Sequence, residues 1–187
     1  MTVLPTEPTA TAHAYDGVTI ALRIEDGERV ITVIGGFEGD DVLFTVDGDA
    51  LGAEGELRRP AVGLPLQIAS LVSFGPRPAP GSDPVVLLSG DDGVTASREA
   101  LLAGWSGEQA TSTALAAGAD LVLWSLIATW TDAEGNAVAR AMVVADGGDH
   151  GLATIEEREG GIAVIPRSST EVWTQLSALL PRRFELA

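Results

Sequence analysis

Apolar and polar positions alternate along the first clear element of the chain. The alternation runs from Val18 to Ile24 and is typical of a strand with one buried face. Asp26-Gly27 is a strong hairpin signal, and Arg29 to Ile34 supplies the return strand. The apolar positions between Val42 and Val46 repeat at every second residue and predict a third strand.

The middle of the chain is less regular. The stretch from Gly48 to Pro60 is polar and rich in glycine, so we expect a loop. Leu64 to Phe74 is apolar, with a period near two in parts. Gly75 to Pro84 carries four prolines and indicates a long hairpin tip or an extended arm. Val85 to Ser89 resumes a strand.

Two helices are expected before the second half of the chain. The first starts near Thr95, and the second runs from a capping-box pattern at Ser106 to Gly118.

Four strands joined by short turns are expected in the C-terminal third. Asp120 to Trp130 is apolar on both faces and predicts a central strand. The strands that follow are predicted from Ala137 to Ala145, from Leu152 to Glu156 and from Ile162 to Ile165. Short turns between these strands imply an antiparallel meander.

The last helix has the clearest signals in the sequence. Ser168 and Glu171 have capping-box spacing, and Pro181 ends the helical pattern. The apolar stripe of this helix must pack on a sheet. We expect this stripe to pack on the strand from Ala137 to Ala145, on the face that carries Ala137, Ala139 and Ala141, because small residues allow a close approach.

These elements predict an α+β fold of antiparallel sheets with packed helices. Residues 1–16 form a loose lead-in, and residues 17–187 form a single domain with halves at 17–105 and 119–181. Both halves end on strand, turn, strand and helix in the same order, from Val85 to Leu101 and from Ile162 to Trp173. Ser97 to Glu99 also matches Ser169 to Glu171 loosely, which suggests a pseudo-twofold duplication of a sheet-plus-helix unit or a chance similarity.

Charge restricts the partners that the chain can bind. It carries 27 acidic residues against 11 basic ones, a net charge of -16. Such a field repels phosphate backbones and anionic lipids, so neither nucleic-acid binding nor membrane insertion is expected. The acidity serves solubility, or it offers a patch to a basic protein partner.

The missing residue types exclude several chemistries. The basic residues are all arginine, and cysteine is absent. A P-loop lysine, a Schiff-base lysine, a thiolate nucleophile and a cysteine zinc site are therefore impossible. No catalytic, cofactor or metal site is predicted. No signal peptide or apolar span is recognisable, so a cytoplasmic location is expected.

One carboxylate and one histidine deserve comparison with a catalytic pair. Asp149 and His150 lie in the glycine-rich run from Asp146 to Gly151. A carboxylate can orient a histidine base, but neighbouring turn residues point in different directions. We interpret the run as a hairpin turn and keep a small hydrolase that uses these two residues as an alternative.

One face of the central strand gathers large apolar residues. Trp124 and Trp130 share this face, and Arg140 and Met142 occupy neighbouring positions on the next strand. The face is either a core covered by the other half of the chain or a groove that binds a partner through these four residues.

The C-terminal part contains four characteristic runs, Trp130 to Gly135, Asp146 to Gly151, Ile162 to Pro166 and Val172 to Pro181. In these runs the chain resembles the EspG family of type VII secretion chaperones. The resemblance implies a pseudo-twofold α+β fold and a cytosolic, non-enzymatic protein that holds secreted PE–PPE heterodimers soluble.

We therefore predict a non-enzymatic protein-binding domain, with a secretion chaperone as its specific form. An acidic immunity or antitoxin-like protein that binds a basic toxin is the alternative within the binding class.

Overall fold

The computed structural model describes residues 18–26, 29–38, 41–47, 56–61, 63–78, 85–88, 121–158 and 161–180. The two helices predicted near Thr95 and from Ser106 to Gly118 lie outside these ranges, as does the lead-in of residues 1–16. One short 3-10 turn, η2, covers Gly148–His150. The strands and helices are β1 Thr19–Asp26, β2 Arg29–Glu38, β3 Asp41–Asp47, β4 Glu56–Pro60, α1 Leu64–Leu71, β5 Val85–Leu88, β6 Val122–Thr131, β7 Ala137–Asp146, β8 Leu152–Arg158, β9 Gly161–Arg167 and α4 Ser169–Leu179.

The described strands form one nine-stranded sheet in the order β4-β3-β2-β1-β6-β7-β8-β9-β5. Each neighbouring pair is antiparallel. This confirms the predicted α+β fold and the C-terminal meander. Glu56–Pro60 was expected within a loop, and that prediction is wrong because these residues pair with β3.

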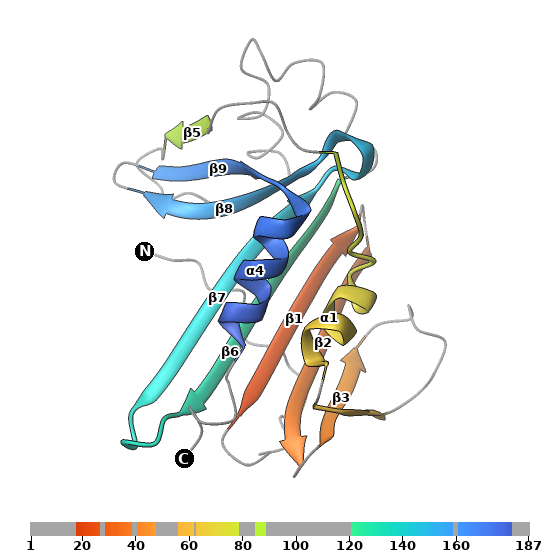
Figure 1. The fold of residues 1–187 in the computed structure, drawn as a ribbon, viewed down its shortest axis with the longest axis vertical. Helices are drawn as coiled ribbons and strands as arrows, with labels where there is room; N and C mark the ends of the chain where they lie inside the picture. The colour runs from red at the N-terminus through yellow and green to blue at the C-terminus, as the bar shows by residue number, and fades with distance from the viewer. Residues whose placement is uncertain are drawn as a thin grey trace.

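The centre of the sheet is a symmetric pair of strands. Leu22 of β1 lies opposite Leu126 of β6, and the pairs on either side are Ile20 with Ala128 and Ile24 with Trp124. From this pair, β2, β3 and β4 continue in one direction, and β7, β8, β9 and β5 continue in the other. In the described chain, four strands and a helix, β1 to β4 and α1, precede β5, and four strands and a helix, β6 to β9 and α4, follow it. Figure 1 shows α1 over the first set and α4 over the second.

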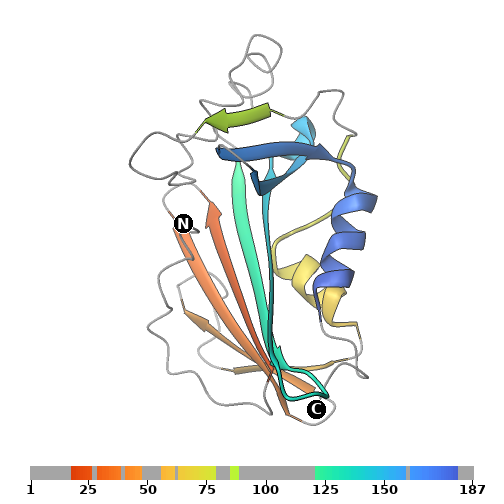
Figure 2. The same cartoon turned by 90° about the vertical axis from the view of Figure 1, so that its left-hand side faces the viewer.

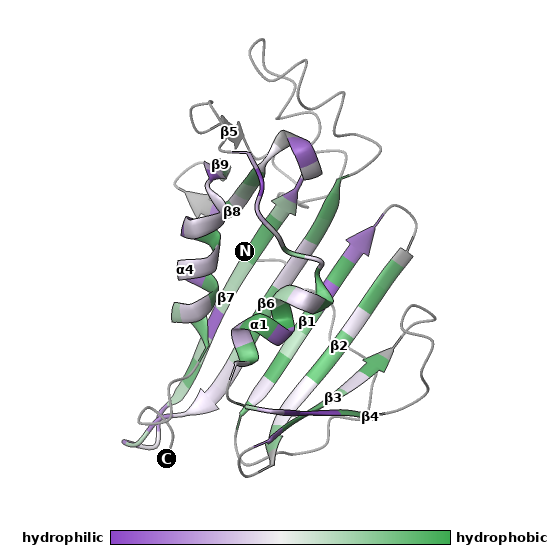
Figure 3. Ribbon diagram, turned by 45° about the vertical axis from the view of Figure 1, so that its right-hand side comes forward, coloured by the Kyte–Doolittle hydropathy of each residue, from purple (hydrophilic) through white to green (hydrophobic). Residues whose placement is uncertain are grey.

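The two helices of the described residues lie on the same side of the sheet. Figure 2 shows α1 and α4 as one layer and the long strands as another. Between the layers lies the main hydrophobic core, where Val172 and Leu176 of α4 and Ile68 of α1 join Trp124 and Leu22 of the sheet. Figure 3 shows the apolar residues of the strands behind the two helices.

The helix α1 replaces the strand-like period seen in the sequence. Gly63 precedes it with φ 88°, and Pro65 stands in its first turn, where a missing N–H costs nothing. Leu64, Ile68 and Val72 face the core at helical spacing. Leu66 would share a strand face with Leu64 and Ile68, but it is 65% exposed.

The last helix begins as predicted. Glu171 N donates to Ser168 Oγ, and Glu171 Oε2 accepts from Ser168 N at 2.7 Å, so the capping box is complete. Its predicted location is wrong. The helix packs on the Trp124 face of the sheet, because its buried stripe belongs to the same core cluster as Trp124 and Met142. Ala137, Ala139 and Ala141 lie on the opposite face and are exposed.

Candidate functional site

The four residues predicted for partner binding lie on the face beneath the helices. Trp124 is 1% exposed, Trp130 3% and Met142 9%, and all three belong to the main core. In this arrangement these side chains hold α4 on the sheet. Of the two predictions made for this face, a core or a partner-binding groove, the arrangement matches the core. Contact between these side chains and a partner requires α4 to move, and such contact stays a prediction.

The indole groups of the two tryptophans stabilise the core by the apolar area that they bury, and their N–H groups add no hydrogen bond to a described residue. Trp124 Nε1 and Trp130 Nε1 are buried, and neither has a hydrogen-bond partner within the described residues. A buried donor without an acceptor costs about 1–3 kcal/mol. The apolar area that each ring buries must offset this cost.

Arg140 links the sheet to the end of α4. Its guanidinium lies 4.8 Å from the centroid of the Trp130 ring, within cation–π range. Its Nη1 donates to the carbonyl of Ala178 at 2.8 Å, near the C-terminus of the helix. A cation there also interacts favourably with the helix dipole. Arg140 therefore stabilises the helix layer.

The opposite side of β6 and β7 presents a different surface, which we call the open face. It consists of Ile127, Thr129 and Thr131 of β6 and Ala137, Ala139 and Ala141 of β7. The register places Ile127 beside Ala141 and Thr129 beside Ala139. Ile127 is half-buried, and the other five residues are exposed.

The open face carries no charged side chain, although the protein has a net charge of -16. Centres of protein interfaces are depleted of charged residues, and this surface shares that one feature with them, although alanine is not a typical interface residue. The sequence signal was the alternation of alanine from Ala137 to Ala141. Its prediction as the surface beneath the last helix is wrong, because the sequence does not determine which face of a strand a distant helix covers.

A polar cluster lies where β7 ends and α4 begins. Arg77 Nε and Nη2 donate to Asp146 Oδ1 and Oδ2 at 2.9 and 3.0 Å, and Arg77 N donates to Ser169 Oγ at 2.8 Å. Asp146 Oδ1 also accepts from Gly148 N at 2.8 Å. The hydrogen bond to Asp146 raises the pKa of Arg77 above its ordinary value. These hydrogen bonds connect the segment after α1 with the end of β7 and with the start of α4.

Of the alternative catalytic pair, the structure describes the side chain of Asp149 alone. Asp149 is exposed, and its charge contributes to the raised pKa of Arg77. The side chain of His150 lies outside the described part of the molecule. The buried carboxylate of the run is Asp146, and Arg77 and Gly148 occupy both of its oxygens.

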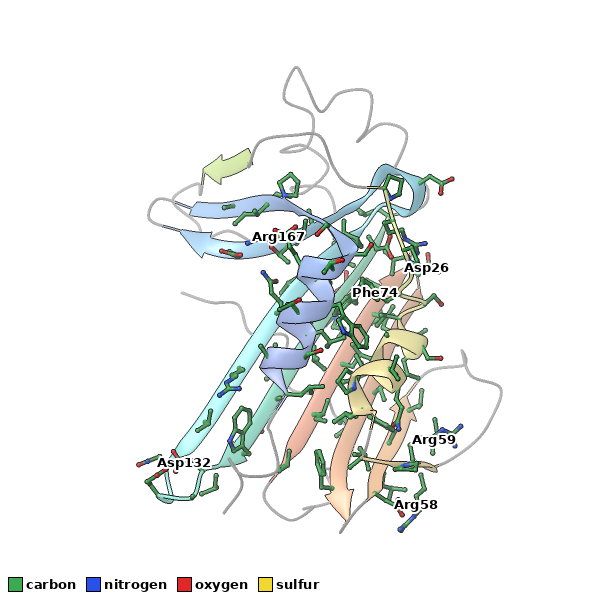
Figure 4. All side chains as sticks on the ribbon, in the orientation of Figure 1. Asp26, Arg58, Arg59, Phe74, Asp132 and Arg167 are labelled. Carbon is green, nitrogen blue, oxygen red and sulfur yellow. The ribbon has the colours of Figure 1, made fainter. Side chains whose placement is uncertain are left out.

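A second polar network connects α4 to the last two strands. Arg167 Nε donates to Thr154 Oγ1 at 3.1 Å, and Arg167 Nη2 lies 2.9 Å from Glu156 Oε1. Glu171 Oε1 lies 3.7 Å from Arg167 Nη1. Arg167 projects toward the start of α4 in Figure 4. This network fixes the N-terminus of the helix on β8 and β9.

The described residues contain neither a group of metal ligands nor a membrane-spanning helix. Over the residues placed by the structure, no group of three or more histidine, aspartate or glutamate side chains could hold a metal ion. Neither of the described helices is long and apolar enough to cross a bilayer.

No protein-family model matches the chain, and no curated protein matches it. A solved structure of the Mycobacterium tuberculosis type VII secretion system chaperone EspG5, in complex with a PE25-PPE41 dimer, is similar at a TM-score of 0.46 with 14% identity. The match covers 93% of this chain and 78% of that chain. That protein bears the name of the family that the C-terminal part resembles.

Proposed function

We propose that this chain is a non-enzymatic protein-binding domain whose contact surface is the open face. One observation carries the proposal. The described helices close one side of the sheet, while on the other side Thr129, Ala139 and Ala141 are exposed and the residues of β6 and β7 on that side carry no charge. The charged residues of β1 on that side, Arg23 and Glu25, form an ion pair with each other. Uncharged side chains on a rigid sheet can be desolvated at low cost, which favours a protein partner.

The specific role that we propose is a cytosolic secretion chaperone that keeps its partner soluble. The resemblance between residues 119–181 and the EspG family supports this role and implies a PE–PPE heterodimer as the partner. The charge of -16 also suits it, because a strongly charged surface keeps a complex of an apolar partner in solution.

Co-expression with an actinobacterial PE–PPE heterodimer tests both parts of the proposal. We expect the wild-type chain to raise the soluble yield of the heterodimer and to co-elute with it in size exclusion. Ala139→Glu places a charge in the centre of the open face and should abolish co-elution. Ala133→Glu is the matched control, because Ala133 is exposed in the β6–β7 turn and lies outside the open face.

The two parts can fail separately. If Ala139→Glu co-elutes as well as Ala133→Glu does, the open face is not the contact surface. If the wild-type chain neither binds nor solubilises the heterodimer, the chaperone role is wrong.

The net charge favours a second candidate, an acidic immunity or antitoxin-like protein. Its binding to a basic toxin would depend on long-range attraction, so the association rate should fall steeply as salt is added. Ala139→Glu would leave or strengthen such binding. The opposite response of this variant separates the two candidates.

We also propose that the two sheet-plus-helix halves descend from a duplicated unit. The repeated order of four strands and a helix, on either side of β5 in the sequence, supports this proposal. Expression of residues 119–187 alone tests it, because a true repeat should form a homodimer through β6. A chain that stays monomeric and unfolded would speak against an autonomous unit.

A further inference from the structure

The outer edge of β7 is only partly paired. Along its inner side, β7 pairs with β6 from Ala137 to Asp146. On its outer side, β8 pairs only with Val144, Ala145 and Asp146. Figure 1 shows β8 and β9 turning away from the long strands at this end of β7. Within the described chain, no strand pairs with the outer side of β7 between Ala137 and Val143.

The hydrogen bonds at both ends of β7 show which backbone groups point outward. At the hairpin tip, Asp132 N donates to Asn136 O at 2.9 Å, so Asn136 faces β6. Residues of an antiparallel strand alternate between the two neighbours, so the even positions that follow also face β6. At the other end, Gly147 N donates to Gly151 O at 3.0 Å, so the odd positions face β8. Both ends therefore agree that Ala137, Ala139, Ala141 and Val143 direct their N–H and C=O groups outward.

The other described edge near a helix, β4, is protected against strand pairing. Pro60 has no N–H, and its carbonyl accepts from Gln67 Nε2 at 2.7 Å. The carbonyl of Arg58 accepts from Arg59 Nη1 at 3.1 Å. Proline, cationic side chains and occupied carbonyls are devices that keep natural edge strands from pairing. Figure 4 shows Arg58 and Arg59 along this edge.

The outer edge of β7 has none of these devices among its outward residues. The four positions that point outward are three alanines and a valine, and the stretch spans about 23 Å at the rise of an extended strand. The side chains of the three alanines belong to the open face and are exposed, so an added strand would meet no bulky group there. Arg140, the one charged residue of this stretch, directs its N–H and C=O groups toward β6, and its side chain donates to Ala178 O on the helix side of the sheet. An edge whose outward backbone groups are regular and unblocked is a template for another strand.

We propose that the outer edge of β7 from Ala137 to Val143 binds an extended segment of a partner protein as an additional β-strand. This rests on the proposed protein-binding function and names the mode of contact. The segment is uncharged where it pairs, to match the outward alanines, and carries arginine or lysine at its ends. A second copy of this chain is a poor occupant because each copy brings a charge of -16.

The added strand extends the open face without interruption. Its main-chain hydrogen bonds supply most of the affinity, and its alternate side chains continue the surface formed by Ala137, Ala139 and Ala141. The length of the added strand is limited at one end by β8, which pairs with β7 from Val144 onward, and at the other end by the hairpin tip between β6 and β7.

Amide hydrogen exchange on the full chain tests the proposal with a defined probe. The probe is the capped peptide Lys-Thr-Val-Thr-Val-Thr-Val-Lys, and a version with glutamate at both ends is its control. In the free protein, the odd amides from Ala137 to Val143 should exchange fast and the even ones slowly. Excess lysine-flanked peptide should slow the odd amides by at least ~10-fold, because each gains a ladder bond. The glutamate-flanked peptide should protect them less.

One variant tests the backbone hydrogen bonds of the edge separately from the side chains of the open face. Ala141→Pro removes an outward N–H while keeping a small side chain and the β6 ladder, so it should abolish the protection of Ala139 and Val143. Ala141→Ser retains the N–H and should respond as the wild type does. The wild-type exchange experiment decides the proposal even if the proline variant folds poorly.

Three results would overturn the proposal. The first is no peptide-dependent protection of the odd amides. The second is protection in dilute protein without peptide, which would mean that the chain covers its own edge. The third is protection that rises with protein concentration alone, which would identify a second copy as the occupant. None of these results depends on the PE–PPE experiment, so a failure here is distinguishable from a failure of the proposed function.

Discussion

Arg77 and Asp146 form a two-bond ion pair across 69 positions of the chain, with the carboxylate 5% exposed and the guanidinium-bearing side chain 26% exposed. The pair joins the segment after α1 to the end of β7. Because Asp146 lies in the interior, its charge depends on Arg77 and on Gly148 N for compensation.

We expect Arg77→Ala to lower the free energy of unfolding by about 2–4 kcal/mol, since it leaves a buried carboxylate unpaired. Arg77→Ala combined with Asp146→Ala should cost less than the sum of the single losses by at least ~1 kcal/mol. Urea unfolding followed by tryptophan fluorescence measures both quantities.

An exposed pair of the same chemistry provides the control. Arg58 Nη1 lies 3.2 Å from Asp41 Oδ2, and these side chains are 55% and 36% exposed. Arg58→Ala should cost no more than ~1 kcal/mol, because water screens this pair. Equal losses at Arg77 and Arg58 would contradict the role assigned to burial.

Gly35 is held to glycine by the ring of Phe44. A Cβ at Gly35 would lie 2.7 Å from both Cδ1 and Cε1 of Phe44, inside van der Waals contact. Gly35→Ala should therefore lower the free energy of unfolding by about 1–3 kcal/mol.

Two further variants check this explanation of Gly35. Phe44→Leu removes the ring and should reduce the additional cost of Gly35→Ala when the two changes are combined. Gly75→Ala is the matched control, because the nearest atom to its Cβ, Arg77 Nη1, would be 3.9 Å away. If the cost at Gly35 persists without the ring, backbone flexibility and not the contact with Phe44 explains it.

The sequence predicted those features that neighbouring residues determine. The capping box of Ser168 and Glu171 depends on residues within one helical turn, and the hairpin from β1 to β2 depends on Asp26-Gly27. The helix α1 was missed because Leu64, Leu66 and Ile68 fit a period of two while Leu64, Ile68 and Val72 fit a period of four. The exposure of Leu66 shows that the buried residues follow the longer, helical spacing.

The candidate site depends on relationships that no local pattern contains. Whether α4 covers Trp124 or Ala139 is decided by how all strands twist and by where α1 leaves room. The free edge of β7 exists because β8 departs after Val144, and the residues of β7 itself do not encode that departure. The alanine alternation was visible in the sequence, but its meaning required the register of the sheet.

The contact between Arg140 and the helix layer can be tested through Trp130. Replacement by Met keeps much of the aliphatic stem and removes the charge and the bond to Ala178 O. We expect Arg140→Met to lower the free energy of unfolding by about 1–2 kcal/mol, from the lost hydrogen bond and the lost cation–π contact.

The location of that loss can be checked separately. The fluorescence of Trp130 should shift in Arg140→Met, and amide exchange near Ala178 should accelerate because the helix end loses a donor. Arg140→Lys should recover only part of the stability, since an ammonium cannot both stack on the ring and donate in the same geometry. Unchanged stability in Arg140→Met would mean that the contact does not hold the helix.

The turn between β6 and β7 makes a pH-dependent contribution to the stability of the fold. Asp132 Oδ1 accepts from Asn136 N at 2.8 Å and from Glu134 N at 3.1 Å. These bonds, chiefly the one from Asn136, lower the pKa of Asp132 below its ordinary value. A carboxyl whose pKa is lower in the folded state binds fewer protons there than in the unfolded chain. Its contribution to stability is therefore full above the unfolded pKa and is lost as the pH falls through the folded pKa.

We expect Asp132→Asn to flatten the acid side of the pH–stability profile and to leave its shape unchanged near neutral pH. The amide oxygen can still accept the turn bonds, so the variant removes the charge with little change in geometry. Denaturant unfolding at a series of acidic pH values measures the slope. Glu134→Gln removes a charge from the same exposed turn and is the control, since only the backbone of Glu134 takes part in the turn bonds. If the two variants change the slope equally, net charge and not the Asp132 hydrogen bonds accounts for the acid sensitivity of this turn.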